Sequence, residues 1–187
     1  MACNLSLGRQ EVCKDSVGGL SGVYFMNYTT ASFTHATGSD PGSPITAFPS
    51  GSTVYYYQLK GTSAYTETVN SSRENGTTFF SQELVLNLKK LTNEMTTQLK
   101  LMAWGRPQIV VHTMAGDALL VGEREGADLT GGTIQTGGSV GDLYGYSVTF
   151  TGQEQYNASF ISGSTFADPF AGLAGAGKPT VVYGANS

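Results

Sequence analysis

Three carboxylates cluster in the segment GEREGAD, residues 122–128. Glu123 and Glu125 are two residues apart, so on a β-strand both side chains would point to one face, with Arg124 on the other. Paired carboxylates can hold a divalent cation or serve as the acid and base of a glycosidase. Exposed charges at a sheet edge give the same pattern more often, so cation binding by Glu123, Glu125 and Asp128 stays open.

The other residues that could do chemistry do not form a catalytic pattern. His35 lies in a Pro/Gly-rich loop and His112 lies in an apolar stretch. No serine has the G-x-S-x-G spacing of a hydrolase nucleophile. In AGLAGAGKPT, residues 171–180, Pro179 follows the lysine, which breaks the phosphate-loop pattern. We therefore expect no enzyme activity and no cofactor, with a hydrolase as a minor alternative.

The N-terminal segment indicates the cellular compartment in which we expect the protein to be made. It begins MACNLSLGRQEVCKD and lacks the basic and apolar regions of a secretory signal. Two cysteines, Cys3 and Cys13, form neither a disulfide framework nor a zinc site, and reduced thiols are expected in a cytoplasmically made protein. Whether these two cysteines pair stays open. No apolar run approaches the roughly 20 residues of a membrane span.

The composition restricts the partners of this chain. Only 13% of its 187 residues are charged, 25 are glycine, and the net charge is −4. The longest basic run is Lys89-Lys90, which argues against direct binding of nucleic acid through phosphate neutralisation. A Gly/Ser/Thr-rich chain with few charges is typical of short strands joined by tight turns. It is also typical of a subunit covered by copies of itself, because such contacts are poor in Lys, Glu and Asp.

Alternating apolar residues predict seven or eight strands in a single domain spanning residues 1–187. We expect a mainly β fold, an antiparallel β-sandwich or partly closed barrel with one short α-helix and long interaction arms. The core should span about residues 18–160, with a C-terminal arm over about 156–187. The predicted strands fall in residues 20–28, 53–61, 63–76, 77–90, 108–123 (a hairpin), 125–138 and 144–154.

Local signals locate two elements within this pattern. Asn75-Gly76 is a strong hairpin signal between two alternating segments, and Leu84, Leu86 and Leu88 should share one face of the second. Thr92 is a suitable N-cap for a helix over 92–104. Met95, Leu99 and Met102 recur at helical spacing and are expected to pack on the core.

The segment GDLYGYSVTFTGQE, residues 141–154, has an unusual strand pattern. Large residues at 144, 146, 148 and 150 alternate with small or hydroxylated ones. The small face is uncharged and is bounded by Asp142 and Glu154. Such a face is neither an ordinary charged surface nor a second core face. The residues predicted to share it are Gly145, Ser147, Thr149 and Thr151.

Three segments together resemble the major tail tube protein of tailed bacteriophages, a family that is also similar to the tube ring protein of type VI secretion. They are YGYSVTFTGQE (144–154), NSSRENGTTFFSQELVLNL (70–88) and LTNEMTTQLKLMAWG (91–105). The resemblance covers roughly residues 53–155. It implies hexameric rings that stack into a tube, with sheets joined edge to edge around a lumen that conducts DNA during genome ejection.

The resemblance also implies partners, a location and roles for residues. Copies of the chain are the main partner, with sheath, baseplate or tail-terminator proteins as further ones, in a virion tail made in the bacterial cytoplasm. DNA should pass without specific binding along a net negative lumen lined by Gly145, Ser147, Thr149 and Thr151, with Gln82 from the neighbouring strand. The adjoining ring should contact the hairpin tip Ser71, Ser72, Arg73 and Glu74.

Residues 1–19, 29–52 and 156–187 are long, low in charge and expected not to pack alone, so we expect them to make intersubunit contacts. Two alternative functions stay open. One is a capsid-associated subunit, such as a head-decoration or head–tail completion protein. The other is a carbohydrate-binding β-sandwich, since the chain has ten tyrosines.

Overall fold

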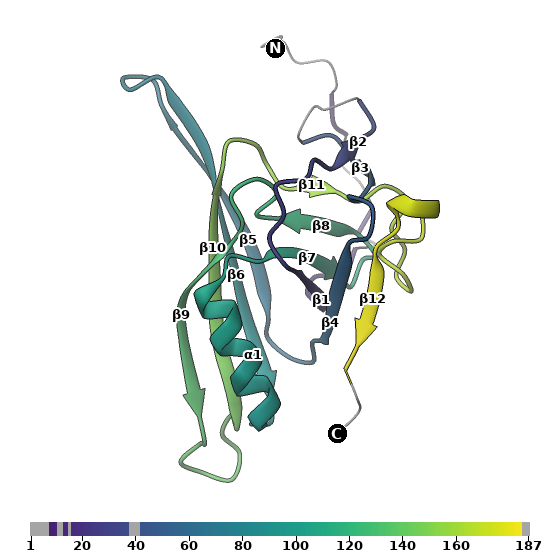
Figure 1. The fold of residues 1–187 in the computed structure, drawn as a ribbon. Coiled ribbons are helices and arrows are strands. Elements are labelled where there is room, and N and C mark those ends of the chain that lie inside the picture. The colour runs from purple at the N-terminus through teal and green to yellow at the C-terminus, as the bar shows by residue number, and fades with distance from the viewer. Residues whose placement is uncertain (1–7, 11–12, 15, 38–41, 185–187) are drawn as a thin grey trace.

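The computed structural model describes residues 8–10, 13–14, 16–37 and 42–184 (Figure 1). Cys3 lies outside these residues, and Cys13 is exposed. The elements are β1 Leu20–Met26, β2 Thr34–His35, β3 Ile45–Ala47, β4 Thr53–Gln58, β5 Ala64–Ser72, β6 Thr77–Lys89, α1 Asn93–Trp104, β7 Gln108–Thr113, β8 Ala118–Val121, β9 Asp128–Gln135, β10 Gly145–Glu154, β11 Ser159–Phe160, a 3₁₀ turn Gly175–Gly177 and β12 Thr180–Tyr183.

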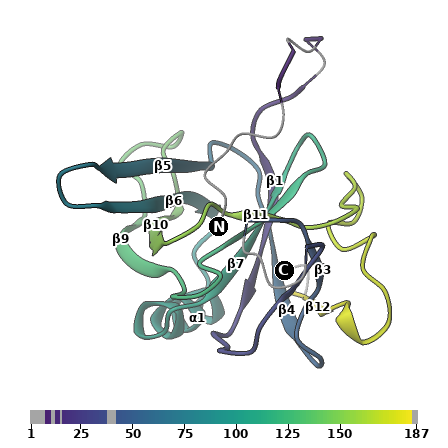
Figure 2. The same ribbon diagram turned by 90° about the horizontal axis from the view of Figure 1, so that it is seen from above.

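Two sheets make up the body of the protein, and Figure 2 shows them on either side of the molecule. A six-stranded sheet has the order β11-β8-β7-β1-β4-β12, and a four-stranded sheet has the order β5-β6-β10-β9. The predicted mainly β fold with one short helix is confirmed. The sheets are antiparallel except that β12 pairs in parallel with β4. They remain separate sheets, so the described strands form a sandwich-like arrangement and do not close a barrel.

The main core lies between the two sheets. Strand β6 contributes Leu84, Leu86 and Leu88, as the alternation predicted, and β10 contributes its own alternate positions. These side chains pack against the inner face of the six-stranded sheet, and burying each large apolar one contributes roughly 1.5–3 kcal/mol. The buried partners from the other strands are Tyr146, Val148, Phe150, Phe25, Ile109, Val111 and Val121.

Helix α1 packs beside this core on the inner side of the four-stranded sheet. Its N-cap is confirmed, because the Thr92 hydroxyl accepts a hydrogen bond from the backbone N–H of Met95 at 3.2 Å. The Tyr146 hydroxyl, from β10, donates to the Thr92 carbonyl at 3.0 Å and ties the start of the helix to the sheet. The predicted stripe packs on the core as half-buried side chains, namely Met95, Leu99 and Met102. In the described part of the chain, no helix is long and apolar enough to cross a membrane.

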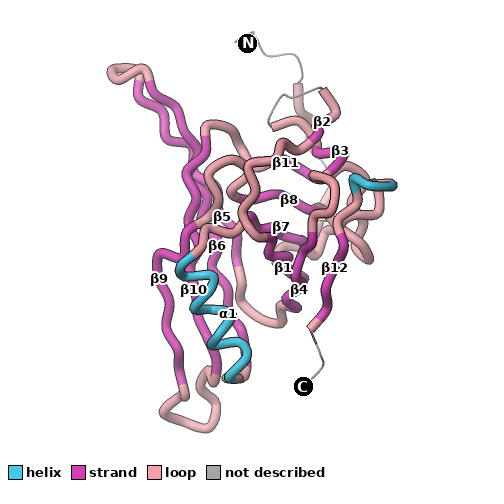
Figure 3. The backbone as a smooth tube through the Cα atoms, in the orientation of Figure 1, coloured by secondary structure: helices cyan, strands magenta, loops and turns pink. Residues whose placement is uncertain are grey.

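A second apolar cluster joins the two segments that were predicted to be arms. Phe33, Ile45 and Phe48, from residues 29–52, pack against Phe170 and other side chains of residues 156–187 on the outer side of the six-stranded sheet. Figure 3 shows these segments mainly as loops beside that sheet. Neither segment packs alone, since both lie on the six-stranded sheet and on each other, and their contact with other copies stays a prediction. Each of the two segments supplies apolar surface that buries the other, a contact that local sequence patterns do not reveal.

The β5–β6 hairpin extends well beyond the body, as Figure 1 shows. Its turn is at Asn75-Gly76, as predicted, and Gly76 has φ 61°, the left-handed conformation that such turns require. The pairing continues in register from Ala64↔Val85 to Ser72↔Thr77. The four-stranded sheet therefore has a part that packs on the body and a part that projects from it.

Candidate functional site: an uncovered sheet face with two open edges

The small residues of β10 lie on the face of the four-stranded sheet that points away from the core. Ser147, Thr149 and Thr151 are half-buried there, whereas Tyr146 and Phe150 point inward and are fully buried. The predicted separation of the two faces is confirmed. Gly145 shares the parity of the small residues but is itself buried. The Leu88 carbonyl of β6 lies so close that a side chain at this position would collide with it.

The positions that β6 adds to this face are the odd ones. Antiparallel pairing sets Ser147 opposite Asn87, Thr149 opposite Val85 and Thr151 opposite Glu83. Paired residues point to the same side of a sheet, so alternate β6 residues from Asn87 to Ser81 join the small residues of β10.

Gln82 therefore lies on the opposite, inner face, and the prediction that it shares the small face is wrong. Its side chain is 1% exposed. Its Oε1 accepts from the backbone N–H of Gly122 at 2.9 Å, and its Nε2 donates to Glu67 at 3.1 Å. The amide joins β5, β6 and the end of β8 in the core. Polarity alone suggested an exposed role, but the strand register decides the side.

The uncovered face is rich in hydroxyl groups and poor in positive charge. Thr66 and Thr68 of β5 pair with the odd positions of β6, and Thr133 of β9 pairs with Ser147. The Thr151 hydroxyl lies 3.2 Å from that of Thr130, within hydrogen-bonding distance. The charged residues at paired positions of this face are Glu83, Asp128 and Lys89. A polyanion would meet hydroxyl groups there and few cations to hold it.

Both edges of the four-stranded sheet are open. Within the described residues, β5 and β9 each pair on one side only. Natural edge strands are commonly protected from pairing by lysine or proline. The β5 sequence AYTETVNSS and the β9 sequence DLTGGTIQ contain neither. The β5 edge does carry the inward-pointing Glu67, and the β9–β10 register shifts between Thr149 and Phe150, but neither edge is paired in the described residues and each has room for another strand.

The predicted contact residues lie at the hairpin tip. Ser71, Arg73 and Glu74 are exposed, and Ser72 is half-buried because its hydroxyl accepts from the backbone N–H of Asn75 at 3.3 Å. The Ser71 hydroxyl lies 3.0 Å from the Thr78 hydroxyl across the strand pair. These contacts stiffen the tip and leave both charged side chains free of the body.

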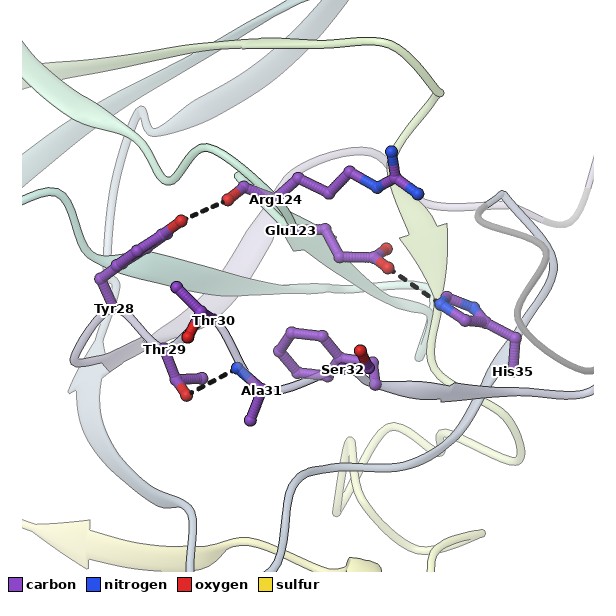
Figure 4. A pocket seen from close by; sticks show the side chains of 9 residues that line it. Tyr28, Thr29, Thr30, Ala31, Ser32, His35, Glu123 and Arg124 are labelled. Carbon is purple, nitrogen blue, oxygen red and sulfur yellow. Dashed lines mark hydrogen bonds and ion pairs between the residues drawn. The ribbon is translucent and has the colours of Figure 1, made fainter.

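The acidic segment 122–128 does not form the alternating strand that the sequence suggested. Gly122 and Gly126 have φ 67° and 80°, and the chain bends between them. Glu123 bonds to His35 at 2.9 Å (Figure 4), whereas Glu125 is exposed near Arg106. Among the described residues no group of three or more acidic, histidine or cysteine side chains could hold a metal ion.

Figure 4 also shows how Glu123 joins distant segments. Its second oxygen accepts from the Ser159 hydroxyl at 2.8 Å, and the other ring nitrogen of His35 donates to the Ser43 carbonyl at 2.9 Å. This network fastens the loop 29–52 to the six-stranded sheet, and within that sheet it links β11 to the segment that follows β8. His112 has a similar structural setting, with Ser21 at 3.1 Å and the Thr165 carbonyl at 2.9 Å from its two ring nitrogens.

Glu154, predicted to bound the small face, turns inward and is buried. Its Oε1 accepts from the backbone N–H groups of Arg124 and Glu125, both at 2.9 Å. Burial is the main cause that raises the pKa of this carboxyl group, and the two hydrogen bonds offset part of the rise. Glu154 has the same parity as the core residues of β10, and this parity is the sequence feature that indicates its burial.

A tyrosine-lined groove separates α1 from β4. Two adjoining cavities of about 410 and 540 Å³ share Tyr55, Tyr57 and Gln98 in their walls. One extends to Tyr28 and the other to Tyr183 at the edge strand β12. Aromatic rings beside an amide are groups that can stack on and bond to a sugar.

Comparisons of the chain with protein-family models, curated proteins and solved structures find no significant match.

Proposed function

We propose that this protein is a structural subunit of a bacteriophage tail, forming hexameric rings that stack into the tube through which DNA is ejected. One observation carries the proposal: the four-stranded sheet has a covered face, an uncovered hydroxyl-rich face and, among the described residues, two open edges. An isolated domain gains nothing from this combination, because open edges invite aggregation.

Ring closure follows from the two edges. They are different strands, so β5 of one copy would pair with β9 of the next in a head-to-tail contact. Repeated head-to-tail contacts close into a ring when the rotation between copies permits. The four-stranded sheets would then form one continuous barrel, with main-chain hydrogen bonds across each junction.

The inner surface of this barrel would be the face carrying Ser147 and Thr149. Phosphates are attracted by Lys and Arg, and each contact with one slows a DNA molecule that must slide. Glu83 and Asp128 outnumber Lys89 among the charged paired positions of the face. DNA would pass without specific binding, and no cofactor is needed.

The remaining partners follow from the same assembly. Residues 1–19, 29–52 and 156–187 would contact neighbouring copies, and exposed apolar side chains such as Phe160 and Phe166 suit that role. Sheath, baseplate or tail-terminator proteins would meet the outside and ends of the tube, and the protein would be located in the virion tail.

Native mass spectrometry of the purified full chain tests the ring. We expect a species of six times the 19.7 kDa chain mass. A protein that stays monomeric at every concentration would contradict the proposal. Rings that never stack, even when concentrated, would favour a head–tail completion subunit instead.

The tyrosine groove favours a second candidate function, a carbohydrate-binding module. Titration with neutral oligosaccharides, followed by intrinsic tyrosine fluorescence, tests it. Saturable binding that Tyr55→Ala abolishes would support this function, and a flat titration would reject it. Phe166→Ala, which removes an exposed ring outside the groove, is the control.

A further inference from the structure

The turn of the β5–β6 hairpin holds an asparagine that is followed directly by a glycine. Asn75-Gly76 is the one Asn-Gly pair in the sequence. Both residues are exposed at the tip, which extends away from the body of the molecule (Figure 1). The last backbone pair of the hairpin is Ser72↔Thr77, so the Asn-Gly pair lies beyond the end of the ladder and is held by the turn alone.

The space around Gly76 is open. A methyl group added at its Cα would meet no atom within 4 Å apart from those of its chain neighbours. Gly76 has φ 61°, and a glycine changes between the left-handed and the other backbone conformations at little steric cost. There is thus room for the Asn75 side chain to turn toward the Gly76 nitrogen.

We propose that Asn75 is a site of spontaneous deamidation. The backbone nitrogen of Gly76, after losing its proton to hydroxide, attacks Cγ of the Asn75 side chain and closes a succinimide ring. The bond from Cγ to the amide nitrogen breaks, and that nitrogen takes a proton from water and leaves as ammonia. Water then adds to either ring carbonyl and opens the ring to aspartate or isoaspartate. The chemistry concerns the single chain and does not depend on the proposed function.

The position of Asn75 distinguishes it from the other asparagines of this hairpin. Ring closure requires the main chain to rotate beside the asparagine, and at Asn75 this rotation breaks no pair of the ladder. Asn70 is paired with Phe79 within the ladder. Asn87 lies deeper in the sheet, and its side-chain amide donates to the Thr62 carbonyl. Paired strands open less often than exposed turns, so we expect the reaction at the tip.

Deamidation would change the charge of the hairpin tip. Arg73 and Glu74 are both exposed there, and either product adds a carboxylate that is ionised at neutral pH. Isoaspartate also carries the main chain through the side-chain carbon, which lengthens the turn by one methylene group. The tip therefore becomes more acidic as the protein ages, without an enzyme or a cofactor.

Mass spectrometry of tryptic peptides from the dilute, folded full chain tests the site. Trypsin cleaves after Arg73 and so separates Asn70 from Asn75, and fragment ions separate Asn75 from Asn87. We expect Asn75 to gain the mass difference between an amide and an acid, and to gain it faster in mildly alkaline buffer. Asn75→Gln should abolish the gain in this peptide, because the longer side chain closes the corresponding ring poorly.

Ser71→Gly provides the matched control, since it puts a second Asn-Gly pair inside the ladder. In the folded variant, Asn75 should deamidate at least about tenfold faster than Asn70, because the ladder protects the second pair. In urea the two rates should become similar. Equal rates in the folded variant would overturn the inference, because the turn would then confer no reactivity. An Asn75 amide that persists in the folded chain and is lost in urea would also overturn it.

Discussion

Ser147 of β10 lies directly opposite Asn87 of β6, and both side chains point away from the core. This pairing defines the uncovered face, because every second residue along both strands follows the same parity. Thr149 and Val85 form the next pair of the face. None of these four side chains belongs to either buried apolar cluster, so the face can change chemically without loss of core packing.

Two lysines on this face test its role as a channel lining. The free energy of unfolding of the double variant Ser147→Lys, Thr149→Lys should be within about 1 kcal/mol of the wild-type value, because substitutions on an uncovered face cost little. Virions assembled with the variant should deliver DNA poorly, and added salt should ease the defect by screening the phosphate contacts. DNA delivery into cells is the measurement.

The control is the double variant Ser147→Gln, Thr149→Gln, which introduces longer side chains at the same positions without a charge. It should deliver DNA at the wild-type rate. Normal delivery by the lysine variant would place this face outside the channel. A lysine variant that fails to fold would place the face in a buried interface.

Gln82 should matter for stability and not for the channel. Gln82→Met keeps the approximate shape but leaves the Gly122 N–H without its acceptor and removes the donor to Glu67. We expect a loss of about 1–3 kcal/mol in the free energy of unfolding. Glu83→Gln, one residue away on the uncovered face, should change it by less than about 0.5 kcal/mol. Urea denaturation measures both, and equal effects would contradict the assigned register.

Glu154 should make stability depend on pH. Its pKa is raised above the ordinary value of 4.5, so the folded state binds its proton more tightly than the unfolded state. That contribution is fully present below the unfolded pKa and is lost as pH rises through the folded pKa. Glu154→Gln keeps an oxygen acceptor for both backbone N–H groups and stays neutral throughout.

The variant should therefore gain stability relative to wild type as pH increases from about 4 to about 8, measured by urea unfolding at each pH. Glu83→Gln is the control for removing one carboxylate from an exposed site. A constant difference between Glu154→Gln and wild type across this range would show that Glu154 does not titrate abnormally.

Arg73 at the hairpin tip should affect stacking more than folding. Arg73→Glu sets two like charges side by side at an exposed tip, so we expect an unchanged free energy of unfolding and a reduced yield of tubes. Tube yield is measured by sedimentation. Lys60→Glu makes the same change of charge at an exposed position outside the hairpin and should leave the yield unchanged. A normal yield of tubes from Arg73→Glu would show that the charge at the hairpin tip takes no part in the assembly contact.

Local signals predicted much of this fold from the sequence. Asn75-Gly76 turns a hairpin because glycine supplies the left-handed conformation, and Thr92 begins a helix because its hydroxyl reaches the backbone N–H of Met95. The alternation around Ser147 separated the two faces of β10 correctly. Each of these outcomes depends on residues close together in the chain.

Features set by distant residues were not predictable in the same way. The side occupied by Gln82 depends on its register with β10, about 70 residues later in the chain, and polarity alone suggested the wrong face. Phe48 is buried because side chains distant in the sequence cover it, among them Phe170, whose ring packs edge to face at 5.5 Å between centroids. Deleting residues 29–52 would thus remove part of a core, so it cannot test an assembly contact alone.

Electron cryomicroscopy of the purified, concentrated full chain tests the central claim most directly. We expect tubes about 100 Å wide, from the size of a ring of domains of this length. In cross-section, the four-stranded sheets should form the innermost layer, with Ser147 and Thr149 facing an open channel. Protein that forms no tubes, or tubes in which α1 or the six-stranded sheet lines the channel, would contradict the account.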